Sequence, residues 1–179
     1  MQKSLKELRR RRIGRVLFGI VLVSAFLRLY ILIPTDVTGI SMYPTFHSND
    51  RVVMSTVSSI DRFDIIVFTD PMNKTVVKRV IGMPGDSVRY DQDQLYINNK
   101  IIEEPFFDRE EIEQEPGLWT SNFDISQTGD QRVPEGHYFL MGDNRRYSYD
   151  SRFYGSISSE SVLGKVVLLY YPIDRIEWH

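Results

Sequence analysis

Beyond Pro34 the sequence alternates apolar and polar residues with a period of two, in short runs rich in Val, Ile, Phe and Tyr. Turn-forming residues separate these runs, as in Pro84-Gly85-Asp86 and Asn98-Asn99-Lys100. This pattern is typical of antiparallel β-strands joined by tight turns. We therefore predict a mostly β fold, with an antiparallel sheet built from residues 51–55, 64–69, 75–82, 87–91, 94–97, 137–141 and 165–171.

Residues 103–134 differ in composition: they are acidic, with scattered aromatic side chains and no sustained hydrophobic period. We predict that this segment is a loop-rich excursion from the sheet. The expected division places residues 34–86 and 136–179 in one β core and residues 87–135 in a smaller inserted region of strands and loops. At 179 residues, the chain is within the usual size of one domain with attachments.

A long apolar run precedes the β region. Residues 16–33 contain one charged side chain, Arg28, and eighteen residues are about the minimum that crosses the hydrocarbon layer as a helix. Arg28 lies near one end of the run, where its stem can reach the headgroups. Positions 1–15 include seven basic residues and one acidic residue. This excess of positive charge predicts that residues 1–15 form a cytoplasmic tail and that the body after residue 33 is extracytoplasmic. The sequence thus predicts one transmembrane helix at 16–33.

A cleaved signal peptide is the alternative explanation of the apolar run, because Val23-Ser24-Ala25 offers small residues where a cleavage site needs them. The apolar stretch continues past Ala25 to Ile33, as a stop-transfer segment does. We therefore favour the anchor.

Composition removes several classes of function. Cysteine is absent, which excludes disulfides, a thiol nucleophile and thiolate metal sites. The tail carries a charge of about +6 and the body about −9, which is unfavourable for nucleic-acid binding by the body. Asp91 and Asp93 weakly resemble a calcium loop, but Leu95 stands where a ligand belongs. We expect no metal and no cofactor.

The stretch "TGISMYPTFHSND" places Ser41 shortly after the apolar run and three residues before Pro44. Proline removes a backbone donor and favours extended geometry in its predecessor, so Ser41 is expected on a loop or strand end. Most loop serines are ordinary turn residues. A catalytic role for Ser41 requires support from elsewhere in the chain.

The stretch "TVVKRVIGMPGD", read as a strand, places Lys78 between valines on one face and Arg79 on the other. An edge strand whose ammonium group reaches water is one explanation. The other is a buried lysine, in which desolvation lowers the pKa. Only lysine of the two can lose its proton near neutral pH, and a neutral lysine is a base able to activate a serine hydroxyl.

The stretch "MGDNRRYSYDSRFYG" concentrates charged and hydroxyl side chains immediately after an apolar strand. It fits a solvated surface loop. It also fits a catalytic loop, because its groups can pair with one another and can orient a base.

Together these stretches resemble the type I signal peptidases, which are membrane-bound serine proteases with a Ser-Lys dyad. The matching blocks occur in the family's order: Ser41-Met42-x-Pro44-Thr45, Arg62-Phe63-Asp64-Ile65-Ile66-Val67-Phe68, Lys78-Arg79-Val80-Ile81-Gly82-x-Pro84-Gly85-Asp86, and Gly142-Asp143-Asn144-Arg145-x-x-Ser148-x-Asp150-Ser151-Arg152 with Gly155. The blocks and the apolar run together cover most of the chain. Gly39 occupies the position where Gram-negative members carry a second oxyanion-stabilising serine. The glycine and the short excursion before Met141 indicate the compact Gram-positive type.

The resemblance implies a role for each matching residue. Ser41 is the nucleophile, Lys78 the general base and Ser148 the residue that orients Lys78, while the backbone at Ser41 and Gly39 faces the oxyanion. It also implies two further sets, a substrate pocket lined by Val37, Met42 and Val77, and scaffolding ion pairs formed by Arg79, Asp143, Arg145, Asp150 and Arg152. Among the last set, Arg79 is expected to pair with Asp143 and Asp150 with Arg152.

The implied function is removal of signal peptides from exported preproteins, with cleavage after small residues of the Ala-x-Ala type. The expected partners are preprotein signal peptides and the lipid bilayer, and we expect a monomer in the membrane. A catalytically silent relative that serves in assembly or binding is the alternative, although both dyad residues are present. A cytoplasmic self-cleaving repressor-type protease conflicts with the apolar run. A Ser-His-Asp hydrolase conflicts with "GISMY", which is not a G-x-S-x-G elbow, and His47 is expected at the surface.

Overall fold

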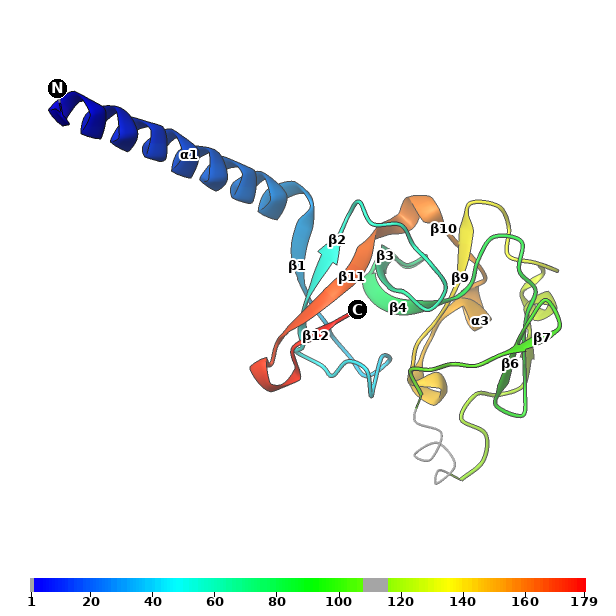
Figure 1. The fold of residues 1–179 in the computed structure, drawn as a ribbon. Coiled ribbons are helices and arrows are strands. Elements are labelled where there is room, and N and C mark those ends of the chain that lie inside the picture. The colour runs from blue at the N-terminus through cyan, green and yellow to red at the C-terminus, as the bar shows by residue number, and fades with distance from the viewer. Residues whose placement is uncertain (1, 108–115) are drawn as a thin grey trace.

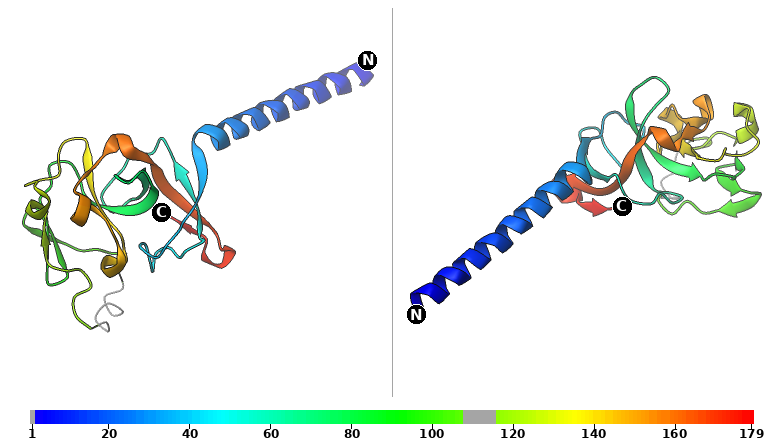
Figure 2. Two further views of the ribbon diagram at one scale, coloured as in Figure 1. Left: turned by 180° about the vertical axis from the view of Figure 1, so that it is seen from behind. Right: turned by 90° about the horizontal axis from the view of Figure 1, so that it is seen from above.

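The computed structural model describes residues 2–107 and 116–179, with side chains omitted for residues 2–8 and 27–30. Helix α1 (Gln2–Tyr30) projects away from a β body, and a small sheet lies at the opposite end of that body (Figures 1 and 2). Part of the predicted excursion, residues 108–115, is outside the described residues.

The larger sheet is eight-stranded and antiparallel, in the order β1-β2-β11-β3-β4-β9-β10, with β12 paired to β11. Segments far apart in the chain therefore lie side by side, notably β11 against both β2 and β3 (Figure 1). Its strands are β1 (Leu32–Asp36), β2 (Arg51–Ser55), β3 (Ile65–Thr69), β4 (Thr75–Gly82), β9 (His137–Met141), β10 (Ile157–Ser158), β11 (Val162–Tyr171) and β12 (Glu177–Trp178).

The smaller sheet is four-stranded and antiparallel, in the order β7-β6-β5-β8. All of its strands fall within residues 87–135. They are β5 (Val88–Asp91), β6 (Gln94–Ile97), β7 (Lys100–Ile102) and β8 (Phe123–Asp124). Asn98 and Asn99 both have positive φ, as a tight hairpin turn requires, and Asn tolerates that region better than most residues.

Short helical turns complete the described chain. The α-helical turn α3 (Ser151–Tyr154) begins at Asp150, whose side chain accepts the Arg152 N–H. The 3₁₀ turns are η1 (Ile125–Thr128), η2 (Arg145–Tyr147), η3 (Ser159–Ser161) and η4 (Ile173–Arg175).

Three apolar clusters form the core. One includes Val37 and Met42 from the loop after β1, packed against Val77 and its neighbours in the larger sheet. A second joins the two sheets, with Ile81 of β4 packed among residues such as Tyr90 of β5. The third covers the remaining face around Ile66, Phe68, Val80, Leu140 and Ile157. The loop that carries Ser41 is therefore anchored by buried side chains.

Strand β4 is buried on both faces because clusters pack on each side of it. It lies between β3 and β9, and the Lys78 side chain is buried. The explanation that Lys78 lies on an edge strand and reaches water is therefore wrong. However, β9 pairs with β4 only from Arg79 onward. The backbone from Thr75 to Lys78 therefore has no strand partner on that side within the described sheet.

The sequence correctly predicted β2, β4, β6 and β9 with the observed bounds. Strands β3 and β5 each begin one residue later than predicted, and β11 begins three residues earlier. The strands β1, β7, β8, β10 and β12 were not predicted. Four of them, β7, β8, β10 and β12, have only two or three residues, which is too short for a period-two pattern to be detected.

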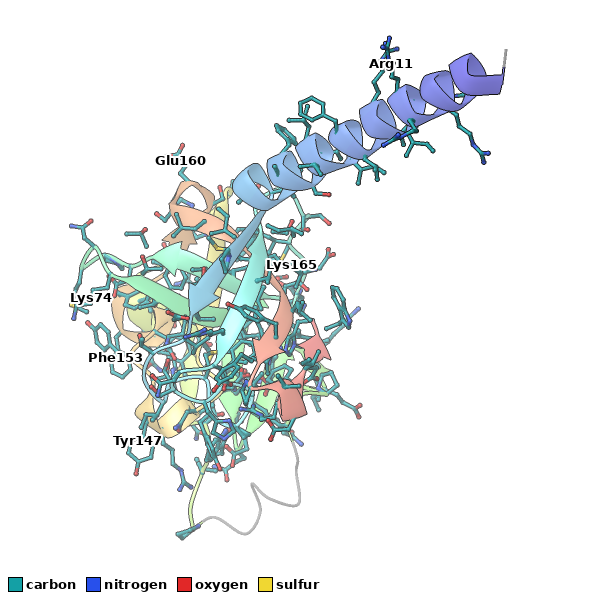
Figure 3. All side chains as sticks on the ribbon, turned by 90° about the vertical axis from the view of Figure 1, so that its left-hand side faces the viewer. Arg11, Lys74, Tyr147, Phe153, Glu160 and Lys165 are labelled. Carbon is teal, nitrogen blue, oxygen red and sulfur yellow. The ribbon has the colours of Figure 1, made fainter. Side chains whose placement is uncertain are left out.

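The predicted end of the apolar helix at Ile33 is wrong. Helix α1 ends at Tyr30, and Leu32 and Ile33 belong to β1, an edge strand in which Pro34 pairs opposite Val53. Proline is tolerated in an edge strand because no partner needs its missing N–H. Figure 3 shows Arg11 on the part of α1 that extends away from the body. Within the described residues, no helix combines the length and apolar content needed to cross a membrane.

Candidate active site

Ser41 lies in a turn between β1 and β2, as the sequence predicts. Two hydrogen bonds from Asn144 hold this turn. The backbone N–H of Asn144 donates to the Ser41 carbonyl at 3.0 Å, and its Nδ2 donates to the Ile40 carbonyl at 3.0 Å. Since Asn144 is buried, the turn is fixed against the loop after β9.

Lys78 extends from β4 to Ser41. The Nζ of Lys78 lies 2.5 Å from the Oγ of Ser41, within hydrogen-bond reach, and the lysine is 3% exposed. Burial lowers the Lys78 pKa from 10.5 to about 8, because the apolar surroundings disfavour the ammonium form. A substantial fraction of Lys78 is then neutral at mildly alkaline pH.

Charges around Lys78 partly oppose this desolvation. The carboxylates of Asp150, Asp143 and Asp70 raise its pKa, whereas the guanidinium of Arg152 lowers it. Desolvation is the largest of these influences, so the net direction is downward. The nearby acids therefore limit how far the lysine pKa falls.

Arg79 points to the opposite face of β4 and pairs with Asp143. Its Nε and Nη2 donate to the two carboxylate oxygens at 2.9 and 2.6 Å, which is the bidentate geometry of a strong ion pair. The Thr45 hydroxyl donates to the same carboxylate at 2.5 Å. Asp143 thus connects β4 to the turn that follows Ser41.

Asp150 and Arg152 form the second pair, with oxygen to nitrogen distances of 2.8 and 2.9 Å. Asp150 also accepts the Gly142 N–H at 3.1 Å, and Arg152 donates to the Arg145 carbonyl at 2.8 Å. Both side chains are almost completely buried. The pair therefore ties the two ends of the loop 142–152 together.

Arg145 is buried and pairs with Glu104, which comes from the inserted region. Its Nε donates to the Gly142 carbonyl at 3.1 Å, and its Nη1 donates to the Thr120 hydroxyl at 3.1 Å. Burial disfavours the charged form of Arg145, but the Glu104 carboxylate and the other nearby groups more than offset it, so the Arg145 pKa is raised. Arg145 was predicted to take part in an ion pair, but the sequence did not indicate its partner.

Ser148 is buried beside the dyad, but its Oγ has no hydrogen-bond partner among the described residues. The hydrogen bond to Lys78 that the resemblance implies is therefore not present in this structure. Gly142 explains how Ser148 fits here. A Cβ at Gly142 would lie 2.3 Å from the Ser148 Oγ and 2.4 Å from the Ser41 carbonyl, so only glycine allows this approach.

A small pocket opens beside Ser41, with a volume of about 50 Å³. A pocket of this small volume suits a small side chain better than a large one. The predicted residues Val37, Met42 and Val77 lie together here. The full lining is Thr35, Asp36, Val37, Thr38, Ser41, Met42, Thr75, Val76 and Val77.

Gly39 lies on the same turn with φ of 85°, a conformation that favours glycine. Its N–H donates to the Ser48 hydroxyl at 3.3 Å. That donor is therefore already engaged in this structure. His47 is exposed, as predicted, and lies against Arg175.

Sequence reasoning missed Asn144 and Glu104. Asn144 stands inside the Gly142-Asp143-Asn144-Arg145 block, so its position was available, but its hydrogen bonds to the turn at Ser41 depend on tertiary structure. Glu104 gave no signal, because a lone carboxylate at the end of a short strand is usually solvated. Only the buried Arg145 beside it reveals its importance.

The comparisons with known proteins agree on one family. The model of the family described as "Signal peptidase, peptidase S26" matches residues 10–171. Signal peptidase I of Bacillus caldolyticus is 40% identical over 163 residues, covering 88% of this chain and 90% of the relative. Signal peptidase I V of Bacillus subtilis (strain 168) is 39% identical over 141 residues, covering 76% of this chain and 84% of that protein.

A solved structure shares the fold. The crystal structure of a signal peptidase I from Enterococcus faecalis V583 superposes with a TM-score of 0.57 at 38% sequence identity, covering 61% of this chain and 97% of that one. The resemblance inferred from the four sequence blocks is confirmed. The chain belongs to the signal peptidase family, peptidase S26, and is a serine protease of that family.

Proposed function

We propose that this protein is a membrane-attached endopeptidase that removes N-terminal signal peptides from exported preproteins with a Ser41–Lys78 dyad, cutting after small residues. The observation that carries the proposal is the 2.5 Å contact between Lys78 Nζ and Ser41 Oγ. The contact lies at a buried lysine whose pKa falls to about 8. A neutral amine at this distance can accept the serine proton.

In the acylation step, Lys78 takes the hydroxyl proton as the Ser41 Oγ attacks the scissile carbonyl carbon. The resulting lysine ammonium then gives that proton to the amine of the departing mature chain, and the signal peptide remains as an ester on Ser41. Hydrogen-bond donors near Ser41 stabilise the negative charge on the carbonyl oxygen. We assign this role to the backbone N–H of Ser41, with Gly39 shaping the turn around it.

In the deacylation step, neutral Lys78 removes a proton from water, and the resulting hydroxide attacks the ester carbon. Collapse of the second tetrahedral intermediate breaks the bond to the Ser41 Oγ, which recovers its proton from Lys78. The signal peptide leaves with a free carboxylate. We assign to Ser148 the orientation of Lys78, by a hydrogen bond that forms as the lysine moves during the cycle.

The substrate is proposed to bind as an extended strand beside the pocket. Two strands flank the pocket, and each has a backbone edge without a strand partner in the described sheet. In β1 this is the edge opposite β2, and in β4 it is the edge from Thr75 to Lys78 that β9 does not reach. A peptide that adds to such an edge alternates its side chains toward and away from the protein. The small volume of the pocket then favours alanine at the position next to the cut.

We further propose that residues 16–30 attach the protein to the membrane, with residues 1–15 cytoplasmic and the body outside. Nine apolar side chains between Ile13 and Phe26 are each at least half exposed along α1. Apolar side chains exposed around a helix favour a lipid environment. In this division, residues 34–86 and 136–179 form the catalytic core, residues 87–135 form the inserted region, and the protein acts as a monomer.

The test is incubation of the detergent-solubilised full chain with a secretory preprotein, followed by N-terminal sequencing of the product. We expect one cut after a small residue in the wild type and none with Ser41→Ala. Cleavage by Ser41→Ala would contradict the proposal that Ser41 and Lys78 form the catalytic dyad. Absence of cleavage by a folded wild type with several preproteins would favour a catalytically silent role instead.

Topology requires a separate experiment. Protease added outside intact protoplasts should degrade the body while leaving the basic tail protected. A body that is fully protected would contradict the proposed orientation.

A further inference from the structure

Residues 104–107 of the inserted region follow β7 and return to the loop that carries the buried ion pairs. Three of their side chains, Glu104, Phe106 and Phe107, contact two buried arginines of the site. Within the described part of the chain, none of the three makes a hydrogen bond or ring contact with Ser41 or Lys78. Their influence on the reaction must therefore pass through the arginines.

Arg79 is held from two sides. Asp143 accepts two hydrogen bonds from its guanidinium, and the ring of Phe106 lies with its centroid 3.8 Å from the guanidinium carbon. A partly desolvated guanidinium stacked on an aromatic ring gains cation–π attraction in addition to its ion pair. Phe106 in turn packs edge-on against Phe63 at 5.3 Å, and the Phe63 carbonyl accepts from Arg79 at 2.8 Å.

Arg145 is held in the same way. Glu104 pairs with its guanidinium, and the Phe107 ring centroid lies 4.6 Å from the guanidinium carbon. Tyr90 donates its hydroxyl to Glu104 at 2.7 Å, which fixes the carboxylate. Arg145 can then donate to the Gly142 carbonyl in a fixed direction.

The two arginines flank the residue that supports the nucleophile. Arg79 fixes Asp143 and Arg145 fixes the Gly142 carbonyl, so the turn 142–145 is restrained at both ends. Asn144 lies within that turn and holds the carbonyls of Ser41 and Ile40. A shift of this turn would move the Ser41 Oγ relative to Lys78.

We propose that Glu104 and Phe106 are positioning residues for the dyad, which makes the inserted region part of the catalytic apparatus. The inference rests on the proposed Ser41–Lys78 chemistry. Glu104 and Phe106 contact the two arginines, and the arginines restrain the turn 142–145 through Asp143 and the Gly142 carbonyl. Asn144 lies in that turn and bonds the backbone of Ser41. An ångström-scale displacement of a reacting group can lower a rate by about a hundredfold, so a partial loosening should be measurable.

Phe106 provides the sharper test. Phe106→Leu keeps an apolar side chain but removes the ring face over Arg79, whereas Phe106→Tyr keeps the ring. We expect the single-turnover rate of Phe106→Leu to fall about tenfold with KM within about twofold, and Phe106→Tyr to stay near wild type. Tyr96→Leu is the matched control, because it removes a comparable ring 4.0 Å from the guanidinium carbon of Arg89 in the small sheet, away from the dyad.

Glu104→Gln tests the other half of the contact. It keeps the shape of the side chain but removes the charge facing Arg145, and it should lower the single-turnover rate in the same way. Glu103→Gln is its control, since the adjacent Glu103 is exposed and makes the same change of charge. Each variant is assayed as the full chain, at a temperature where circular dichroism shows it folded.

The pH profile separates positioning from loss of folded protein. A looser Arg79 neutralises Asp143 less completely, and the Asp143 charge favours protonated Lys78. The acidic limb of the Phe106→Leu profile should therefore move to higher pH, while a smaller folded fraction would lower the rate equally at every pH.

The outcomes are distinguishable. A folded Phe106→Leu and a folded Glu104→Gln with wild-type rates would overturn this inference while Ser41→Ala remains inactive. A rate that falls equally in Tyr96→Leu, or that Phe106→Tyr does not restore, would also overturn it. Activity in Ser41→Ala would overturn the proposed chemistry itself.

Discussion

Lys78 and Ser41 are 37 positions apart in the sequence, yet the lysine Nζ lies 2.5 Å from the serine Oγ. Lys78 is the last residue of β4 before its pairing with β9 begins, and the turn after β1 packs against this part of the strand through Met42 and Val77. Two different structural demands are met at this position. The lysine is buried enough to lower its pKa to about 8, and the serine that it contacts lines an open pocket.

The first prediction concerns proton acceptance. Lys78→Arg keeps a positive charge and similar length but cannot lose its proton near neutral pH, so activity should vanish even where the fold survives. In the wild type, kcat/KM should fall about tenfold for each pH unit below the Lys78 pKa of about 8 and level off above it. Single-turnover cleavage across a pH range measures both. Substantial cleavage by Lys78→Arg would exclude this lysine as the base.

The second prediction concerns stability. The unfolded chain binds a proton at Lys78 more tightly than the folded chain, so burial of the ammonium destabilises the fold below pH 8. This destabilisation should decline as pH rises from about 8 to 10.5, the unfolded value. Lys78→Met, which carries no charge, should therefore be more stable than wild type by an amount that is largest at pH 7 and shrinks toward pH 10.5. Denaturant titrations at several pH values measure this difference, and a difference independent of pH would contradict it.

The third prediction concerns the support of the nucleophile. Asn144→Ala keeps the backbone N–H but removes the donor to the Ile40 carbonyl, leaving that acceptor without the bond. We expect kcat to fall by about tenfold with little change in KM, because the turn loosens while the pocket remains. Asn122→Ala is the control. Asn122 also bonds a backbone group with its side chain, but it accepts the Gln92 N–H at the exposed edge of the small sheet. Equal losses in both variants would contradict a specific role for Asn144.

Much of this architecture was predictable from the sequence. Long strands such as β4 and β9 alternate over enough residues to be recognised, and turn residues mark their ends. The very short strands β8, β10 and β12 depend on pairing with longer neighbours, which the local sequence does not encode. Strand β1 was hidden because its first residues continue the apolar run of α1.

The candidate active site was likewise predictable only in part. Ser41, Lys78 and the pairs Arg79–Asp143 and Asp150–Arg152 could be predicted, since the sequence blocks that contain them resemble those of the signal peptidases. The contacts of Glu104 and Asn144 could not be predicted, because they depend on how the inserted region returns to the loop after β9. Side-chain direction decides such contacts, and it requires the tertiary structure.

The fourth prediction concerns Ser148. Its hydroxyl is buried without a hydrogen-bond partner, so Ser148→Ala should cost little stability or none. The proposed orienting role predicts slower cleavage than wild type, but more cleavage than Lys78→Arg, because the base is still present. Thermal unfolding and single-turnover rates on the same preparations measure both quantities. A wild-type rate in Ser148→Ala would remove the orienting role.

The fifth prediction uses Gly142, where steric contact alone sets the outcome. An alanine Cβ there would lie 2.3 Å from the Ser148 Oγ and 2.4 Å from the Ser41 carbonyl, distances far inside van der Waals contact. Either the Ser41 turn or the Ser148 side chain must move, and we expect Gly142→Ala to lose at least about a hundredfold in kcat.

Gly14→Ala is the matched control, because a Cβ at that helical position has no atom within 4 Å. It should leave the cleavage rate unchanged. Substrate binding offers a second measurement on an otherwise inactive background. Binding of a signal peptide to Ser41→Ala should weaken when Gly142→Ala is added, since the turn that the substrate strand meets has moved. Unaltered cleavage by a folded Gly142→Ala would show that the close approach of these segments does not set the geometry of the dyad.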